Sequence, residues 1–167
     1  MVIVGIDPGL ASTGYGVVES VRGGLRVVAA GDIRPARALP LAARLAALHE
    51  ALAAVMASAQ PDTAVLEKVF IHARHVTTAA MMAHVRGVAC LAAEQHGVPV
   101  VEYLPTRIKR ALTGRGHASK EQVARMVSQW TGAADASWSS DATDALALAI
   151  AHAHMTAPHL ALPAGAA

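Results

Sequence analysis

Aromatic residues and cysteines are scarce in this 167-residue chain, and each shortage excludes a class of structure. Aromatic residues make up 3% of the sequence, which is too little for broad platforms on which nucleic-acid bases stack. The single cysteine, Cys90, cannot form a disulfide within the chain, which suits a reducing cytosol. Its neighbours are apolar, so a buried thiol is a better interpretation of Cys90 than a catalytic nucleophile.

Long apolar runs and targeting signals are also missing. No run of apolar residues is longer than that from Ala145 to Ala151, far short of the roughly 20 residues that span a bilayer. The N-terminal sequence MVIVGIDPG has no basic segment and reaches an acidic residue at Asp7, which is unlike a secretory signal peptide. We therefore expect a cytoplasmic protein that does not enter membranes.

Acidic residues are nearly absent from one stretch of the chain. Residues 105–125 hold six basic residues against one acid, a local charge of +5, and the other eight basic and eleven acidic residues leave −3 elsewhere. Such a stretch is typical of a surface that binds a polyanion, although a face of solvated cations is an equally good interpretation. The basic residues are Arg107, Lys109, Arg110, Arg115, Lys120 and Arg125.

Apolar residues, by contrast, are abundant. They make up 54% of the sequence, and the mean hydropathy is +0.39. This composition excludes a disordered chain and supplies enough apolar surface for one core. We expect a single domain over residues 1–157 and a flexible tail over residues 158–167.

The order of sequence patterns indicates an α/β fold. Alternating apolar residues predict strands at 2–7, 14–20 and 25–31, and later patterns predict strands at 63–68 and 98–103. Apolar residues at three- and four-residue spacing predict helices between Pro40 and Pro61 and at about 77–96, 120–130 and 141–154. We therefore expect a mixed five-stranded sheet, an antiparallel meander followed by parallel strands, with helices on both faces.

Four acidic residues interrupt hydrophobic segments: Asp7, Glu67, Asp141 and Asp144. Burying unpaired carboxylates is costly, so such groups are protonated, paired with bases or gathered around a cation. Asp7 and Glu67 end predicted strands that can meet at one sheet edge, and Asp141 and Asp144 share one helix face. A turn explains Asp7 taken alone, and the helix dipole explains the other two aspartates, but four coincidences are improbable. Oxygen ligands alone favour Mg²⁺ or Mn²⁺.

The segments that carry these acids resemble the RuvC family, the bacterial Holliday junction resolvases of the RNase H-like superfamily. GIDPGLASTGYGVV at residues 5–18 is similar to the opening motif of the family, and LEKVFIHAR at 66–74 is similar to its next acidic segment. VRGVA at 85–89 lies where the family has Arg-Gly, and DATDALALAIAHAH at 141–154 resembles its C-terminal acidic helix. The first motif alone also resembles the phosphate loop of actin-like ATPases, which need a second lobe.

The resemblance implies a metal-dependent nuclease site. Asp7, Glu67, Asp141 and Asp144 fall on the four acidic positions that bind metal and catalyse in the family, with two Mg²⁺ ions, or Mn²⁺ in their place. Lys109 and Lys120 fall on basic positions near the junction in the family. Phe70 falls on the position of an aromatic residue that inserts at the branch point. The alternative interpretation of Phe70 is a core residue that ends a strand. The expected DNA-binding residues are Phe70, Arg74, Lys109, Arg110, Arg115 and Lys120.

The helix predicted at 77–96 is apolar on more than one face, so it needs a second surface to bury. In the family this helix lies at the homodimer interface, and the resemblance therefore places Ala80, Met81, Met82 and Val85 there.

The function implied is resolution of Holliday junctions by paired cuts in two strands of like polarity, leaving 5′-phosphate and 3′-hydroxyl ends, in recombination and repair. The expected partners are a four-way DNA junction, a second copy of the chain and the branch-migration proteins RuvA and RuvB. Two alternatives stay open: an RNase H-like nuclease with another substrate, such as RNA–DNA hybrids, and a non-catalytic junction-binding module.

Overall fold

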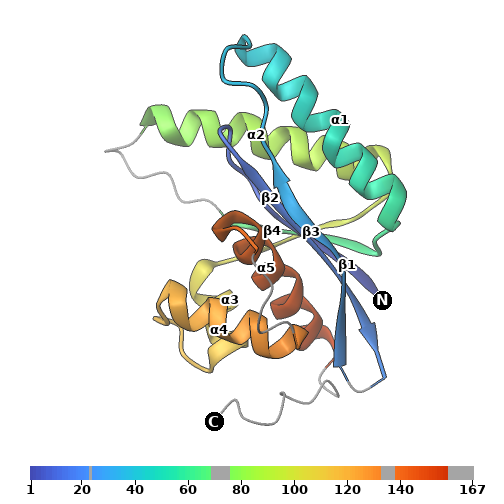
Figure 1. Ribbon diagram of the computed structural model, residues 1–167, viewed down its shortest axis with the longest axis vertical. Coiled ribbons are helices and arrows are strands. Elements are labelled where there is room, and N and C mark those ends of the chain that lie inside the picture. The colour runs from blue at the N-terminus through green and yellow to red at the C-terminus, as the bar shows by residue number, and fades with distance from the viewer. Residues whose placement is uncertain (23, 69–75, 133–137, 158–167) are drawn as a thin grey trace.

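The computed structural model describes residues 1–22, 24–68, 76–132 and 138–157 (Figure 1). The tail expected at 158–167 lies outside these residues. The strands are β1 (Val2–Asp7), β2 (Thr13–Val21), β3 (Gly24–Ile33), β4 (Thr63–Glu67) and β5 (Val100–Tyr103). The helices are α1 (Leu41–Ala59), α2 (Val76–Gln95), α3 (Pro105–Thr113), α4 (Lys120–Thr131) and α5 (Ser140–Thr156).

The strands form one mixed sheet in the order β3-β2-β1-β4-β5. β2 pairs antiparallel with both β1 and β3, whereas β4 runs parallel to both β1 and β5. This topology confirms the expected meander followed by parallel strands. Because β1 and β4 are parallel neighbours, their carboxyl ends, Asp7 and Glu67, lie at the same edge of the sheet.

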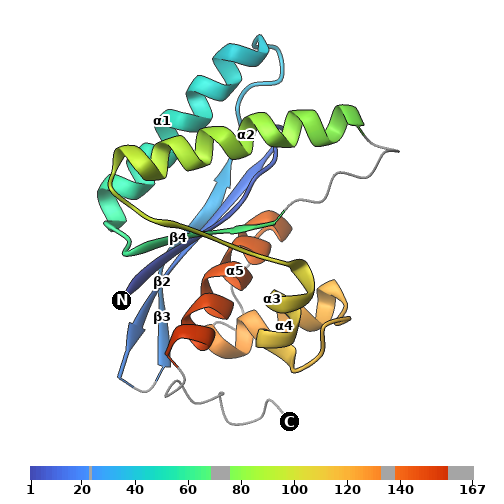
Figure 2. The same cartoon turned by 180° about the vertical axis from the view of Figure 1, so that it is seen from behind.

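Two hydrophobic cores lie on opposite faces of the sheet. α1 and α2 cover one face, and α5 covers the other with α3 and α4 beside it (Figures 1 and 2). Successive residues of a strand point to opposite faces, so β1 sends Val4 and Ile6 into the core beside α1 and α2, and Ile3 into the core that contains α5. The expected helices on both faces are therefore present.

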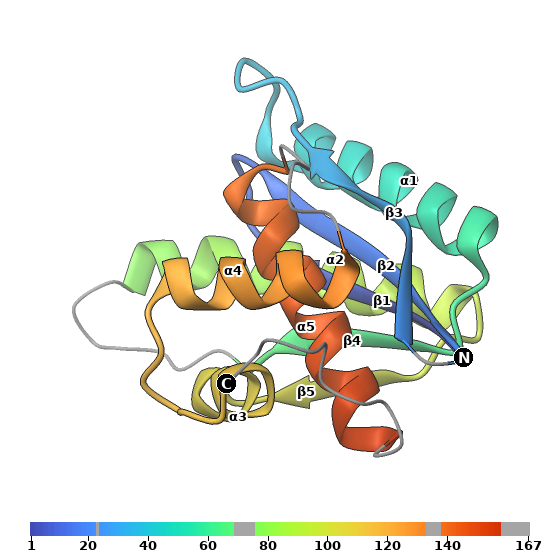
Figure 3. The ribbon, with the colours of Figure 1, turned by 60° about the horizontal axis from the view of Figure 1, so that its bottom comes forward.

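Glycines let α5 lie directly on the strands, across which it runs in Figure 3. A Cβ atom at Gly5 would stand 2.0 Å from the carbonyl oxygen of Ala145, and one at Gly14 would stand 2.0 Å from the carbonyl oxygen of Asp141. At Gly16 an added Cβ would stand 2.7 Å from Cγ of Leu146. Side chains at these positions would displace the helix, so the three glycines set how closely α5 approaches the sheet.

The sequence patterns do not predict α3. This helix begins with Pro105 at its first position and ends before Gly114, which has a left-handed φ of 73°. Ile108 and Leu112 are its buried side chains. Two apolar residues at one spacing of four are too short a pattern to distinguish a helix from a loop.

Strand β5 begins two residues later than predicted, because Val98 belongs to the turn that caps the C-terminus of α2. Gly97 has a left-handed φ of 67°, and the N–H of Val98 donates to the carbonyl oxygen of Ala93 at 2.9 Å. The start of α4 follows the prediction, with Ser119 and Gln122 forming the expected capping box.

One helix in the described part of the chain, α1, is long and apolar enough to cross a membrane by length and composition alone, which is weak evidence for a membrane span. Leu48, Leu52 and Met56 of α1 are buried within the protein. Packing on the sheet therefore accounts for the large apolar side chains on one face of this helix.

Replacing Gly5 by alanine is expected to destabilise the protein by about 1–3 kcal/mol, because the new methyl group must push the backbone of α5 away from β1. The midpoint of thermal unfolding, followed by circular dichroism, measures this loss. The control is Gly24→Ala, whose added Cβ meets nothing within 4 Å and should change stability by less than about 0.5 kcal/mol. Equal midpoints for the two variants would contradict the close approach of α5.

Candidate active site

Asp7 and Glu67 end the neighbouring parallel strands β1 and β4. Every second residue of a strand points to the same face of the sheet, so Asp7 shares a face with Ile3 and Glu67 shares a face with Val65. Ile3 and Val65 both lie in the core that contains α5. The two carboxylates are therefore directed to the face of the sheet that α5 covers. Both residues are half-buried.

α5 brings two further acids to this edge of the sheet. Asp141 lies in the first turn of α5, and Asp144 follows three residues later on the same helix face. On the sheet, Gly14 is the partner of Asp7 in the β1–β2 register, and its missing side chain admits the main chain of Asp141. The glycine contact therefore sets the first turn of α5 beside the end of β1.

Asp7, Glu67 and Asp144 line one cleft with a volume of about 310 Å³. Asp141 does not line this cleft, although its charge acts on Asp7. The remaining lining residues come from α3, α4 and α5 and supply two lysines and an apolar wall: Pro105, Ile108, Lys109, Lys120, Val123, Ala147 and Leu148. The cleft is therefore acidic at the sheet edge and basic on the opposite wall.

Burial and neighbouring negative charges raise the proton affinity of Asp7 and Glu67. Burial raises the pKa of Asp7 to about 6, with further contributions from the charges of Asp144, Asp141 and Glu67. Burial is also the main cause that raises the pKa of Glu67, followed by repulsion from Asp144. Asp7 and Glu67 are thus destabilised as anions, and the positive charge of a bound cation would oppose this destabilisation.

Two lysines offset part of this negative charge. Nζ of Lys120 donates to Oδ2 of Asp144 at 3.0 Å, and this hydrogen bond is the main cause that raises the pKa of Lys120. Lys109 and Lys120 both act to lower the pKa of Glu67, against the larger effect of burial. Lys120 is exposed, so its ammonium group remains accessible from solvent.

The donor set fits a hard divalent cation. The carboxylates that meet in the cleft offer oxygen ligands only, and Mg²⁺ is commonly held by one or two carboxylates together with water and substrate phosphates. Within residues 1–22, 24–68, 76–132 and 138–157, no group of three or more His, Cys, Asp or Glu side chains is placed to hold a metal ion. The site therefore suits ions completed by water and phosphate oxygens.

Arg86 of α2 is a supporting residue that the sequence analysis does not identify. Its Nη1 donates to the main-chain carbonyl oxygen of Glu67 at 2.6 Å, and its Nη2 pairs with the carboxylate of Glu102 on β5. The guanidinium group thus joins α2, β4 and β5 at the point where β4 ends. The signal for it is an arginine in an otherwise apolar helix segment, VRGVA.

The other expected DNA-binding residues lie apart from the cleft or outside the described chain. Arg110 near the end of α3 and Arg115 in the connection to α4 are exposed, and neither lines the cleft. Phe70 and Arg74 lie outside the described residues.

The assignment of Val85 to a dimer interface is wrong. Val85 is 0% exposed within the single chain, because it lies on the face of α2 that is packed inward with Ala89, Ala92 and Ala93. Helical spacing alone did not reveal which of the apolar faces packs on the sheet. Ala80 is exposed, and Met81 and Met82 are half-buried.

The mixed sheet, with carboxylates at two parallel strand ends and on the helix that crosses them, defines the RNase H-like class of nuclease. The family model described as Crossover junction endodeoxyribonuclease RuvC matches residues 3–152. The chain belongs to this RuvC family, whose nucleases depend on metal ions.

Relatives and solved structures agree with this assignment. The chain is 44% identical over 152 residues to the RuvC of Bradyrhizobium diazoefficiens, covering 91% of this chain and 86% of the relative. It is 45% identical over 157 residues to the RuvC of Chloroflexus aggregans, covering 94% of each chain. The structure of Thermus thermophilus RuvC, 33% identical, superposes with a TM-score of 0.87 and covers 98% of this chain and 99% of its own.

Asp7→Asn is expected to stabilise the metal-free protein at about pH 8 and to lose this advantage near pH 4. The pKa of Asp7 rises on folding from 3.8 to about 6, so the folded state binds the proton more tightly. Wild-type stability therefore falls as pH rises through this range, and the full cost is present above pH 6. Thermal unfolding with a chelator across this pH range measures the difference.

The control for this experiment is Glu50→Gln, which neutralises an exposed acid on α1. Its effect on stability should not vary over the same pH range. A gain for Asp7→Asn that is equal at pH 4 and pH 8 would contradict the raised pKa of Asp7.

Proposed function

We propose that this chain resolves four-way DNA junctions by metal-dependent hydrolysis of phosphodiester bonds. The observation that carries this proposal is the cleft in which Asp7, Glu67 and Asp144 face Lys109 and Lys120. Carboxylates attract divalent cations and lysines attract phosphates, so the cleft supplies ligands for both parts of a metal–phosphate complex. Support for the substrate comes from a structure of T. thermophilus RuvC in complex with Holliday junction substrate, 34% identical with a TM-score of 0.88.

We assign Asp7, Glu67, Asp141 and Asp144 as ligands for two Mg²⁺ ions, for which Mn²⁺ can substitute. Two ions held by these carboxylates would supply activation of a water molecule and stabilisation of the leaving 3′-oxygen, and hydrolysis would leave a 5′-phosphate and a 3′-hydroxyl. The strand ends hold Asp7 and Glu67 in place, and α5 holds the other two acids against them. Repulsion within this set provides the free energy that favours cation binding.

Lys120 has a second task in this proposal. Its ammonium group neutralises Asp144 directly, at 3.0 Å. A cation bound by Asp144 would replace this neutralisation, and Nζ of Lys120 would then be available to contact a phosphate of the cut strand. Lys109 stands on the same wall, and the exposed Arg110 and Arg115 extend the positive surface along the DNA. Phe70 and Arg74 complete the proposed interface at the branch point.

We also propose that α2 forms a twofold homodimer. Ala80, Ala83, Gly87 and Leu91 recur at spacings of three and four along the face opposite Val85, and all four are exposed. Leu91 is 51% exposed, the largest value among the exposed large apolar residues of the described chain. Ala80 lies on this exposed face, and the half-buried Met81 and Met82, which lie nearer to the side of Val85, are proposed at its edge. A twofold dimer sets two sites on one junction, so that two strands of like polarity are cut.

The setting that fits this activity is recombination and repair in the bacterial cytoplasm, where RuvA and RuvB are the proposed branch-migration partners. Residues 1–157 form the proposed single nuclease domain. The described residues support this boundary, because one sheet carries helices packed on both of its faces.

Glu67→Gln is expected to reduce junction cutting by more than about 100-fold while junction binding persists, because the shape is kept and one ligand charge is lost. A cleavage assay with Mg²⁺ on a four-way junction, a linear duplex and an RNA–DNA hybrid measures rate and substrate choice, and gel mobility without Mg²⁺ measures binding. Glu50→Gln, exposed on α1, is the control and should cut normally.

The outcomes of this assay separate the alternatives. Near-normal cutting by Glu67→Gln would remove Glu67 from the metal site. A wild-type protein that prefers the RNA–DNA hybrid would be a nuclease of another specificity. One that binds the junction but cuts nothing would be a binding module.

Ala80→Glu is expected to produce folded monomers that no longer make paired cuts, because each dimer would bury two unpaired carboxylates. Light scattering gives the molar mass, circular dichroism reports folding, and a circular substrate carrying one junction reports paired cuts. Ala57→Glu makes the same change at an exposed position of α1 and should remain dimeric. A wild-type monomer at micromolar concentration that still resolves junctions would contradict the interface.

A further inference from the structure

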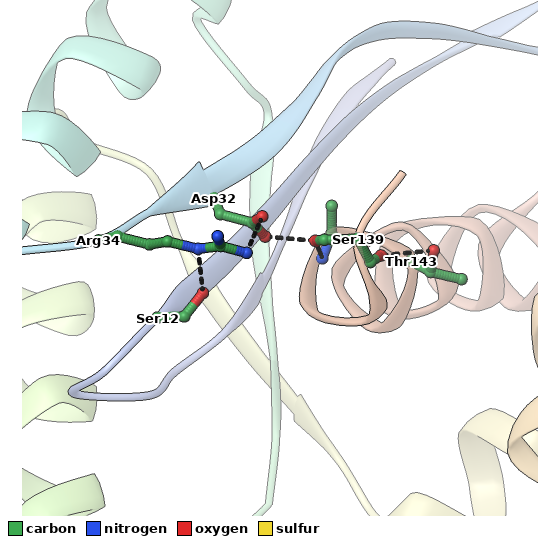
Figure 4. Close-up of polar contacts among 6 residues, drawn as sticks. Ser12, Asp32, Arg34, Ser139 and Thr143 are labelled. Atoms are coloured by element: carbon green, nitrogen blue, oxygen red, sulfur yellow. Dashed lines mark hydrogen bonds and ion pairs between the residues drawn. The ribbon is translucent and has the colours of Figure 1, made fainter. Parts of the chain in front are cut away.

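Asp32 at the end of β3 connects two segments that border the carboxylate cleft without lining it. Its Oδ1 accepts a hydrogen bond of 2.5 Å from the hydroxyl of Ser139, and its Oδ2 accepts one of 3.0 Å from Nη2 of Arg34 (Figure 4). The side chain of Asp32 is 16% exposed, so both bonds are partly shielded from water.

Ser139 connects Asp32 to α5. It is the N-cap residue, and its hydroxyl oxygen accepts the N–H of Ala142 at 3.0 Å. Its carbonyl oxygen accepts both the N–H of Thr143 at 3.0 Å and the hydroxyl of Thr143 at 2.8 Å. A serine hydroxyl has one proton, and donation of this proton to Asp32 leaves the oxygen free to cap the helix. The first turn of α5, which contains Asp141, is therefore attached to β3.

The second arm of the network leads toward Asp7. Nε of Arg34 donates to the hydroxyl of Ser12 at 3.4 Å (Figure 4). Ser12 lies in the connection that follows Asp7, and this connection is held from within by the hydroxyl of Thr13, which donates to the carbonyl oxygen of Gly9 at 2.7 Å. Asp32 thus connects the segment that follows Asp7 to α5, the helix that carries Asp141 and Asp144.

The packing of α5 explains why such an attachment is needed. The helix approaches the sheet closely at Gly5, Gly14 and Gly16, and farther along it packs on strand side chains such as Ile3 and Val65. At Gly14, beside the first turn of α5, the sheet offers no side chain to fix that turn. The bond from Ser139 to Asp32 supplies that restraint at the end of α5 where it matters for Asp141 and Asp144.

We propose that Asp32 is a positioning residue of this nuclease: through Ser139 it sets where Asp141 and Asp144 stand relative to Asp7, and so sets the affinity of the site for Mg²⁺. This inference rests on the proposed function of the carboxylates. Residues that orient metal ligands from behind commonly contribute 10–100-fold to metal affinity or activity.

Two variants break the bond from opposite sides. Asp32→Ala removes the acceptor and leaves the helix cap intact. Ser139→Asp keeps a residue that is equally favoured at the N-cap, but it replaces the hydrogen bond to Asp32 by repulsion between two carboxylates. The first variant removes a negative charge and the second adds one, so a loss of Mg²⁺ affinity shared by both cannot arise from net charge. Ser139→Thr keeps both hydroxyl functions and should restore normal behaviour.

The matched control is Glu19→Ala, which removes an acid from the other end of the same strand pair. Glu19 on β2 pairs with Arg26 on β3, and both lie far along the strands from the Gly14–Asp32 pair. This variant shows how far the loss of an acid–arginine contact between β2 and β3 by itself changes Mg²⁺ affinity and thermal stability.

Mg²⁺ binding is measured by calorimetry on the full chain without DNA, together with KM and kcat for junction cutting and the midpoint of thermal unfolding. We expect Asp32→Ala and Ser139→Asp to weaken Mg²⁺ binding by about 10–100-fold and to lower kcat at fixed Mg²⁺, with the KM for the junction within about twofold. Glu19→Ala and Ser139→Thr should bind Mg²⁺ as the wild type does.

Unchanged Mg²⁺ affinity in both bond-breaking variants would overturn the proposal, even if their thermal midpoints fall, because that result describes a structural contact only. Loss in one variant and gain in the other would also overturn it, since net charge then explains the effect. A wild-type protein that binds Mg²⁺ in an Asp32-dependent manner but cuts no junction would leave the positioning role intact and contradict the proposed function.

Discussion

The close contact between α5 and the glycines of β1 and β2 is the constraint on which the site depends. Asp7, Glu67 and Asp144, from three elements, can meet in one cleft only if the helix backbone approaches the sheet to a distance that leaves no room for a Cβ at Gly5 or Gly14. Ordinary helix–sheet packing, with side chains between the layers, would hold Asp144 farther from Asp7. The apolar core on this face, including Leu146 and Ile150, stabilises that contact.

This arrangement has an electrostatic cost that the rest of the fold must offset. Burial, together with the charges of the neighbouring acids, raises the pKa of Asp7, and holding this carboxylate ionised is unfavourable for folding at neutral pH. The lysine at position 120 reduces the cost through its bond to Asp144. The same repulsion favours divalent cations, so the feature that weakens the metal-free protein is the one that prepares the site for its ions.

The sequence predicts the sheet and the location of the strand-end acids because these depend on local patterns. Alternation in β1, and the short apolar run of β4 that ends at Glu67, are visible within a few residues. The rest depends on contacts between distant segments. Val85 was assigned to the wrong face because periodicity does not say which apolar face packs inward, and Ser139 lies 107 residues from Asp32, so no local pattern connects them.

The sheet also joins the site to the helix on its other face. Arg86 bonds to the carbonyl oxygen of Glu67 and to Glu102, so a shift of α2 would strain two contacts of one guanidinium group at the end of β4. α2 is the helix proposed to contact a second copy of the chain. The hydrogen bond from Arg86 therefore connects the helix of the proposed interface to the main chain of Glu67. Restraints from both faces therefore converge on the carboxyl edge of β1 and β4, where Asp7 and Glu67 lie side by side.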